Sequence, residues 1–260
     1  ERERERERQR VERESRERER ERQRERRKMF ALFCAISISA TMFRRNTSSD
    51  NQKKKVRIGV LGCGSMGFAA IRRFASFPSQ YTVNAWNRTY AKAERSGGHA
   101  YRSAETMVAE SDVVVIFLGN LEIAKKVVAE IPALSFRDKH VISLVSSNPT
   151  QAKDFAEFIR SEGRDIRSYV DGAYAGAPST ILDGSGLIMA SVDFGDPPSI
   201  VSTTLKTLGK VEFVKGTMGC AKAIDYAIVD MYFANLVFFL NGLGMIEAEG
   251  VSSESLQRLM

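Results

Sequence analysis

Three glycines in one short stretch are the first residues whose types and spacing indicate chemistry. The stretch GVLGCGSMG places Gly62, Gly64 and Gly67 between the apolar segment VRIGVL and the segment MGFAAIRRFASF, which has helical periodicity. A G-x-G-x-x-G pattern between a strand and a helix is typical of dinucleotide binding: the first glycine permits a tight turn, the second lets the backbone approach a pyrophosphate, and the third lets the helix pack closely. Because the start of a helix favours phosphate, we expect Ser65 and Met66 to contact the cofactor as well.

A second group of polar residues follows the apolar segment YTVNAW. Asn87 lies 20 residues after Gly67, where an enzyme that uses NAD would carry an acid to bind the ribose 2′-hydroxyl. The sequence instead offers Asn87, Arg88 and Thr89. An acid would repel a 2′-phosphate, whereas Arg88 can pair with it through two charge-assisted hydrogen bonds, and Asn87 and Thr89 can donate more. The residues therefore predict a site for NADP(H).

A third group lies near the C-terminal end of the sequence. Lys222, Asp225, Tyr226 and Val229 fall on one face of a predicted helix that is otherwise apolar. One interpretation is a Lys222–Asp225 ion pair that faces water at the start of the helix. The other is a proton donor that faces the nicotinamide, because a carboxyl group in an apolar cleft has a raised pKa and can protonate or stabilise a reacting nitrogen.

The segments between these groups alternate between strand and helix patterns. Strands are predicted at VRIGVL, YTVNAW, HAY, DVVVIFL, HVISLV, RSYVD, GLIMAS and KVEFV, with helices between most of them. This alternation predicts a Rossmann-type, doubly wound α/β fold with a mostly parallel sheet over residues 56–216.

The sequence changes character after Gly216. About 30 residues without proline, apolar on most sides, predict a long buried helix that begins an all-helical domain over residues 217–260. Lys222, Asp225, Asp230 and Asn235 make it too polar for a bilayer. Gly250 would end it and Ser252 or Ser253 would cap another helix, within which Met260 falls, so we expect this helical domain to be incomplete.

The charge of the chain is concentrated at its N-terminal end. The net charge is +7, but residues 1–55 carry 19 of the 39 basic and 11 of the 32 acidic residues, which leaves the remainder near neutral. Any affinity for nucleic acid therefore belongs to this tail. The three cysteines have no CxxC spacing and the two histidines no metal-ligand spacing, so we expect no metal site and a reducing compartment.

The tail itself is a low-complexity run of Glu and Arg that cannot bury a core. It begins with Glu, and a repeated GAGAGA would translate as Glu-Arg, so we interpret residues 1–28 as an untranslated leader, with Met29 as the start. We expect their deletion to leave folding intact. Residues 29–50 are compatible with an organelle presequence or with a disordered leader, so the predicted location is cytoplasmic or, alternatively, an organelle.

Four motifs, IGVLGCGSMG, AWNRT, DVVVIFL and VDGAYAGAPS, occur in the order and separation that resemble the β-hydroxyacid dehydrogenase superfamily, which includes 6-phosphogluconate dehydrogenase. The resemblance covers about residues 56–251. It implies cofactor contacts at Leu118, the last residue of DVVVIFL, and at Ser146, which fits the second member of a hydroxyl pair whose first member is replaced by Val145.

Within that superfamily the sequence looks most like the imine reductases, which typically carry a D-G-A segment, here Asp171-Gly172-Ala173. They also carry an Asp or Tyr six residues after the glycine that opens the interdomain helix. Asp225 lies six residues after Gly219, so the resemblance implies that Asp225 is the proton donor. It further implies a small-molecule substrate and a homodimer in which the helical domain completes the partner's active site.

Two alternatives remain open. The first is a β-hydroxyacid dehydrogenase with Lys222 as its catalytic lysine, although the glycine spacing before Lys222 differs by one residue. The segment Ala175-Gly176-Ala177 also lacks the serine that such enzymes use to hold a carboxylate. The second is a non-catalytic NADP-binding module in which the basic N-terminal tail carries the function.

Overall fold

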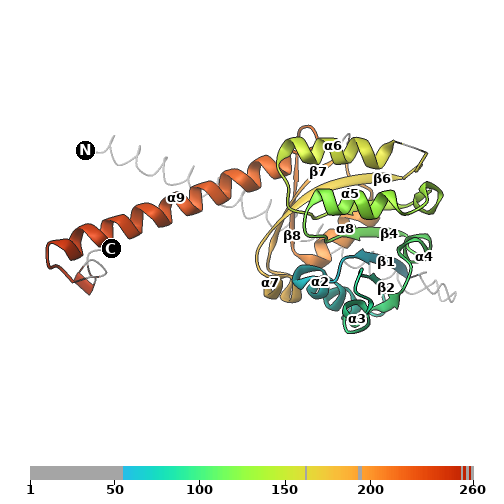
Figure 1. Cartoon of the computed structure of the whole chain (residues 1–260), viewed down its shortest axis with the longest axis horizontal. Helices are drawn as coiled ribbons and strands as arrows, with labels where there is room; N and C mark the ends of the chain where they lie inside the picture. The colour runs from blue at the N-terminus through green and yellow to red at the C-terminus, as the bar shows by residue number, and fades with distance from the viewer. Residues whose placement is uncertain (1–54, 162, 193–194, 253, 256–257, 259–260) are drawn as a thin grey trace, which may run out of the picture. The chain divides into compact units, whose positions relative to one another are not determined.

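Eight strands form one sheet in the order β3-β2-β1-β4-β5-β6-β7-β8 (Figure 1). The structure is a computed structural model, and it describes residues 55–260 except 162, 193–194, 253, 256–257 and 259–260. The strands are β1 (Val56–Leu61), β2 (Tyr81–Trp86), β3 (His99–Tyr101), β4 (Val113–Ile116), β5 (His140–Ser143), β6 (Ser168–Ala175), β7 (Leu187–Val192) and β8 (Lys210–Val214). The predicted α/β fold with a mostly parallel sheet is confirmed. The expectations for residues 1–54 lie outside the described residues.

Helices cover both faces of this sheet (Figure 1). They are α2 (Ser65–Ala75), α3 (Tyr90–Glu94), α4 (Ala104–Ala109), α5 (Leu121–Ala129), α6 (Pro149–Arg160), α7 (Pro178–Asp183), α8 (Ser199–Leu208) and α9 (Cys220–Ala248), with a 3-10 turn η1 (Ala133–Phe136). Successive β4 residues point to opposite faces, so Val113 and Val115 pack with α2, α3, α7 and α8, while Val114 and Ile116 pack with α4, α5 and α6. A strand buried on both sides in this way reads as a continuous apolar run.

Most helices on the second face begin with a side-chain cap. Asn120 accepts a hydrogen bond from the N–H of Ile123 at the start of α5. Asn148 and Gln151 form a reciprocal capping box at α6, where Pro149 occupies the first helical position. By contrast, α2 begins at Gly64 with no side-chain cap. The N–H groups of that helix start therefore stay available to a ligand.

The region after β5 differs from the expectation in two ways. β6 continues to Ala175, four residues past the predicted RSYVD, and it pairs with β7 in the antiparallel direction, whereas the other pairs in the sheet are parallel. The short helix α7, which begins at Pro178, has no counterpart among the predicted elements. The strand extends because Gly172, Ala173 and Tyr174 find partners in β7, which lies further along the chain.

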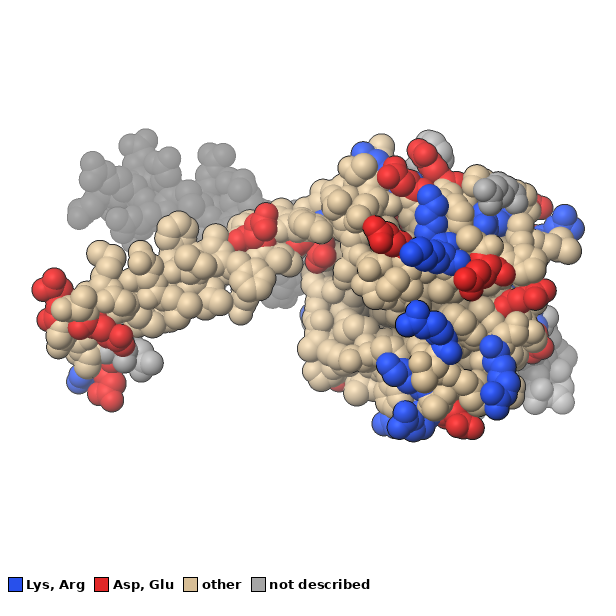
Figure 2. Space-filling model, viewed as in Figure 1, with Lys and Arg blue, Asp and Glu red and all other residues tan. Residues whose placement is uncertain are grey.

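The long helix α9 is buried only in its first turn. Ala221 and Lys222 are buried, and the N–H of Ala221 donates to Ser191 Oγ of β7 at 2.8 Å. Further along, large apolar side chains are exposed, and Figure 2 shows few charged groups among them. The predicted length is confirmed but the predicted burial is absent from the described part of the chain, because the elements that α9 contacts, β6, β7 and α6, lie beside its start.

Among the described helices, α9 alone has the length and apolar composition that a membrane-crossing helix needs. The sequence-based expectation was that its polar residues exclude a bilayer. Three of those four residues, Lys222, Asp225 and Asp230, lie in its first half, and the helix still contains a stretch that is apolar enough to meet the criterion. Helices that are buried in the core of a soluble protein have the same length and composition, so this feature alone assigns no function to α9.

Candidate cofactor and catalytic site

The glycine turn after β1 has the geometry that the pattern predicts. Gly62 has a φ of +106°, and a Cβ atom there would lie 2.3 Å from the carbonyl oxygen of Phe117. A Cβ atom at Gly67 would lie 1.9 Å from the carbonyl oxygen of Gly62. Neither position can hold a side chain, because the two backbones and the loop after β4 approach too closely. These two glycines are required by packing alone.

Gly64 is different, because its surroundings are open. A Cβ atom there would meet nothing within 4 Å, and its φ of −72° is accessible to any residue. Packing therefore does not require a glycine, but a ligand that approaches the backbone would. α2 has no acidic residue in its first turn, and its arginines lie in its last turn. This turn fits the pyrophosphate of a dinucleotide, held by the N–H groups that follow Gly64.

Asn87 links the glycine turn to the loop after β2. Its Oδ1 accepts from the N–H of Cys63 at 3.1 Å, and its Nδ2 donates to the carbonyl of Thr89, also at 3.1 Å. The amide thus makes its bonds within the protein, and these bonds fix the loop that contains Arg88 against the glycine turn. A direct bond from Asn87 to a ligand stays a prediction. Burial raises the pKa of the Cys63 thiol to about 11, although Lys92 opposes the rise, so this cysteine is no nucleophile.

The other predicted cofactor residues gather at the same edge of the sheet. The glycine turn follows β1, Arg88 and Thr89 follow β2, and Leu118 and Ser146 follow β4 and β5. These four parallel strands are neighbours in the order β2-β1-β4-β5, and the order of the strands switches from one side of β1 to the other between β3 and β4. In such sheets the crevice outside the carboxyl ends of the strands, at the reversal point, is where ligands bind. Arg88, Thr89 and Ser146 are exposed there.

Lys222 lies inside the protein. Its side chain is 1% exposed, and its Nζ donates to the carbonyls of Val145 at 2.7 Å and of Gly172 at 2.5 Å. The carboxylate of Asp171, which is 0% exposed, has its Oδ1 3.7 Å from the same nitrogen. Burial lowers the pKa of Lys222 and raises that of Asp171 to about 6, while each group's charge opposes the shift of the other. The prediction that Lys222 touches substrate does not fit this arrangement, because its donors are directed at protein oxygens.

Asp225 lies one turn further along α9 and is half-buried. Burial raises its pKa above the ordinary value, and the charge of Lys222 opposes that rise. The predicted common face of the helix is divided: Lys222 points inward, whereas Tyr226 and Val229 are 49% and 43% exposed. The alternative in which Lys222 and Asp225 form a pair facing water is wrong for Lys222. Of the two members of that pair, Asp225 is the one that stays accessible.

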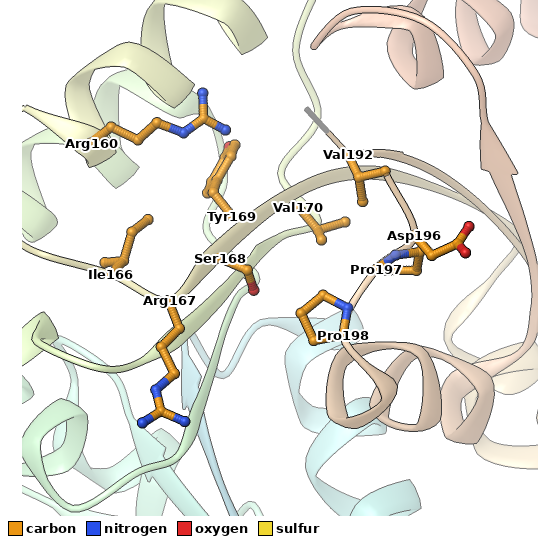
Figure 3. A pocket seen from close by; sticks show the side chains of 10 residues that line it. All are labelled: Arg160, Ile166, Arg167, Ser168, Tyr169, Val170, Val192, Asp196, Pro197 and Pro198. Carbon is orange, nitrogen blue, oxygen red and sulfur yellow. The ribbon is translucent and has the colours of Figure 1, made fainter. Parts of the chain in front are cut away.

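A separate pocket lies beside the start of β6 and the end of β7 (Figure 3). It has a volume of about 260 Å³, and its lining is Arg160, Ile166, Arg167, Ser168, Tyr169, Val170, Val192, Asp196, Pro197 and Pro198. Ser168 begins β6 and Val192 ends the antiparallel β7, so the pocket faces away from the glycine turn. It contains none of the predicted site residues. Within the described residues no cluster of His, Cys, Asp and Glu has the makings of a metal site.

Two features of the site could not be read as such from the sequence. Asp171 stands in the D-G-A segment, and nothing in the neighbouring sequence indicates its burial beside Lys222. Arg102 follows β3 and stacks on the ring of Tyr90, with its Cζ 4.0 Å from the ring centroid. An isolated arginine after a three-residue strand carries no pattern of its own, so only the pairing of β2 with β3 shows that it lies at the same end of the sheet as the loop after β2.

Comparison with known proteins shows which family shares this sequence and fold. The family model described as the NAD binding domain of 6-phosphogluconate dehydrogenase matches residues 57–215, which is more than half of the chain. An NADPH-dependent reductive aminase from Aspergillus oryzae is 24% identical over 194 residues, which are 74% of this chain and 64% of that protein. The chain thus spans less than two thirds of the length of that relative.

Solved structures share the fold. A reductive aminase from Aspergillus terreus, in complex with NADPH and ethyl-5-oxohexanoate, aligns with a TM-score of 0.67 and 23% identity over 80% of this chain and 71% of that chain. A 3-hydroxyisobutyrate dehydrogenase from Mycobacterium tuberculosis, with L-serine, aligns with a TM-score of 0.69 and 19% identity over 79% of this chain and 69% of that one. At these identities the likeness concerns the fold.

Proposed function

Because this chain belongs to the family of the NAD-binding domain of 6-phosphogluconate dehydrogenase, we propose that it is an NADPH-dependent reductase of imine-type substrates. The family is one of NAD(P)-dependent oxidoreductases, and the cofactor is NADP(H). When bound, its nicotinamide supplies a hydride for the carbon of a C=N bond. The residues of the chain would bind the two ends of the cofactor and would protonate the imine nitrogen or stabilise its positive charge.

The preference for NADPH is argued from the loop after β2. Arg88 is exposed at the carboxyl end of that strand, and Asn87 ties the loop to the glycine turn. A 2′-phosphate that lies beside the turn would meet a guanidinium on a loop that is already held in place. Position 87 carries no acid, which in an enzyme that uses NADH would bind the ribose 2′-hydroxyl. The fixed loop lowers the entropic cost of forming the charge-assisted pair.

The single observation that favours an imine substrate over a hydroxyacid is the difference in burial between Lys222 and Asp225. Lys222 is buried and donates to two backbone carbonyls, whereas Asp225 is half-buried and accessible. A carboxyl group with a raised pKa holds a proton near neutral pH more readily than an exposed one, and its ionised form attracts an iminium. Asp225 would therefore donate the proton to nitrogen or stabilise the cation.

The hydroxyacid alternative requires a lysine that contacts the substrate and a group that holds a carboxylate. The Nζ of Lys222 is enclosed by protein oxygens, and Ala175-Gly176-Ala177 offers no hydroxyl side chain. The non-catalytic alternative makes a different demand, namely cofactor binding without turnover. The proposal and both alternatives therefore predict different results for one set of measurements.

The test uses the full chain, purified, with NADPH and NADH titrated first by fluorescence. Oxidation of NADPH is then followed with cyclic imines, and reduction of NADP⁺ with 3-hydroxy acids. Turnover of imines alone supports the proposal, and turnover of hydroxyacids alone would replace it with the alternative. Selective NADPH binding without turnover of either class would favour the non-catalytic module.

We further propose that a second copy of the chain covers the apolar surface of α9. Tyr232, Val237 and Phe238 are 65%, 62% and 74% exposed, and they lie on different sides of the helix. A helix that is apolar all round is normally buried, and this surface has no cover from the described part of the chain. Pairing of two α9 helices would bury the apolar side chains on one side of each helix, and other parts of the second copy would have to cover the remaining sides.

Light scattering over a range of protein concentrations tests this pairing. A dimer is expected for the wild type, and Phe238→Glu or Val237→Glu is expected to shift it toward the monomer. Leu134→Glu is a matched control, because Leu134 is 66% exposed on η1, away from α9. A monomer at all concentrations, with sedimentation onto lipid vesicles, would instead indicate that a membrane covers α9.

A further inference from the structure

Arg102 and Tyr90 form a stacked pair next to the loop that carries Arg88. The guanidinium carbon of Arg102 lies 4.0 Å from the centroid of the Tyr90 ring, which is within the distance at which a cation over an aromatic face is attracted. Tyr90 opens α3 directly after Thr89, and Arg102 directly follows β3. The pair therefore links the loop after β2 to the loop after β3.

The sheet fixes where this pair lies. Trp86, the last residue of β2, is in register with Tyr101, the last residue of β3, and its Nε1 donates to the carbonyl of Arg102 at 3.3 Å. Arg102 consequently lies across from Asn87, at the same edge of the sheet as Arg88. The backbone of Arg102 is held by the indole, and its side chain is held by the phenol ring.

The charges around the pair are unbalanced. Within the described part of the chain, no carboxylate forms an ion pair with the guanidinium of Arg88 or Arg102. Lys92, on the same short helix as Tyr90, adds a third cation close enough to act on the Cys63 thiol. An exposed guanidinium that is stacked and without an anionic partner loses less freedom when an anion arrives, because the stack already restricts its rotamers.

We propose that Arg102 is a second specificity-determining cation for the 2′-phosphate of NADPH, presented from the loop after β3 and held in place by Tyr90. This inference rests on the proposed NADPH site and adds a residue to it. Arg88 approaches the phosphate from the loop after β2, and Arg102 approaches from the neighbouring strand. Each of the two guanidinium groups can then donate two hydrogen bonds to oxygens of the same phosphate.

The assignment makes a selective prediction about binding. Arg102→Ala should weaken NADPH about tenfold and change NADH by less than about twofold, since NADH has no 2′-phosphate. Tyr90→Phe keeps the ring and should have no effect, whereas Tyr90→Leu should weaken NADPH by a smaller factor than Arg102→Ala. Arg102→Lys keeps the charge but not the flat stacked group, and should give an intermediate loss.

Binding is measured by the fluorescence of Trp86, the only tryptophan of the chain, which ends β2 beside the site. Adenosine 2′,5′-bisphosphate and adenosine 5′-monophosphate serve as probes that isolate the phosphate from the nicotinamide. Arg72→Ala is the matched control: Arg72 is also exposed and stacked, 4.6 Å from the centroid of the Phe68 ring, but it lies in the last turn of α2. It should change neither affinity.

The outcomes separate this inference from the function it rests on. If the wild type shows no preference for NADPH, the proposed cofactor specificity fails, and this inference fails with it. If the preference exists and depends on Arg88 but not on Arg102, only the present inference is overturned. Equal losses for both cofactors in Arg102→Ala would also overturn it, because they would show a role in the adenosine or in loop structure instead.

Discussion

The Nζ atom of Lys222 lies 3.7 Å from Oδ1 of Asp171, and neither side chain is reached by solvent. The pair joins the first turn of α9 to the middle of the sheet, because Asp171 belongs to β6. Two backbone carbonyls complete the surroundings of the ammonium group. The site thus contains a buried ion pair that anchors the helix on which Asp225 is presented.

Removing one member of this pair should strongly destabilise the protein. Lys222→Met leaves the buried carboxylate of Asp171 without its counter-charge, and we expect a loss of about 3–5 kcal/mol in the free energy of unfolding. Lys222→Met combined with Asp171→Asn should recover part of that loss, since no charge remains buried. Urea denaturation measures both. Lys206→Met, an exposed lysine on α8, is the control.

The same pair should make stability depend on pH in a particular direction. Burial raises the pKa of Asp171 from its ordinary 3.8 to about 6, so the folded state binds the proton more tightly than the unfolded state. Its contribution is fully present below pH 3.8 and is lost as the pH rises through 6.

Other carboxylates titrate in that window, so the comparison is with Asp171→Asn. The advantage of the wild type over this variant should shrink by about 2–3 kcal/mol between pH 4 and pH 7, from roughly 1.4 kcal/mol per unit of pKa shift. Denaturation at several pH values measures it. A difference that stays constant across the window would contradict the prediction.

Two glycines of one motif should behave in opposite ways. Gly64→Ala has space for its methyl group and should leave the melting temperature unchanged or slightly higher, while it weakens NADPH by blocking the approach of the pyrophosphate. Gly67→Ala would place its methyl group against the carbonyl of Gly62 and should destabilise the fold by about 1–3 kcal/mol. Thermal melting and cofactor titration on both variants separate packing from binding. Tight NADPH binding by Gly64→Ala would place the pyrophosphate elsewhere.

Arg88 should govern the choice of cofactor. Arg88→Ala removes a charge-assisted contact that only a 2′-phosphate can make, so NADPH should bind more weakly by about 1.5–3 kcal/mol and NADH should be unaffected. Fluorescence titration of both cofactors provides the measurement. Arg95→Ala, an exposed arginine at the end of α3, is the control. Equal affinities for the two cofactors in the wild type would sink this prediction.

Asp225 should be needed for turnover but not for cofactor binding. Asp225→Asn preserves the shape and removes the titratable proton, so imine reduction should fall by about 10²–10⁴-fold with little change in NADPH affinity. Asp230→Asn, on an exposed position of the same helix, is the matched control. Steady-state rates and fluorescence titration are compared for the two variants. Full activity in Asp225→Asn would remove the residue from the proposed chemistry.

How far the sequence could predict this molecule depends on the distance between interacting residues. The turn at Gly62 and Gly67 was predictable because its requirements are local: a strand, a tight turn and a helix start within a few residues. The burial of Lys222 was not, because its acceptors, Val145 and Gly172, lie 77 and 50 residues away in the chain. Helical spacing alone put Lys222 and Tyr226 on one face, whereas the sheet buries one and leaves the other exposed.

The same reasoning explains the errors around β6. Asp171 marked the expected end of the strand, since a glycine and small residues follow it. The strand continues because β7 returns antiparallel and supplies partners to Ala175, a pairing that depends on residues beyond Gly186. α7 was missed because its six residues are too few to show a helical period.

The strand order also has a consequence for how this chain is made. β2 and β3 are laid down on one side of β1, and then β4, β5, β6, β7 and β8 are each added beside the strand already at the other edge. No strand has to be inserted between two that are already paired. A nascent chain can therefore add the strands to the sheet in the order of their synthesis, and the last of them, β8, precedes α9 in the chain. The apolar α9 emerges last among the described helices longer than one turn, when Asp171 is already in place to receive Lys222.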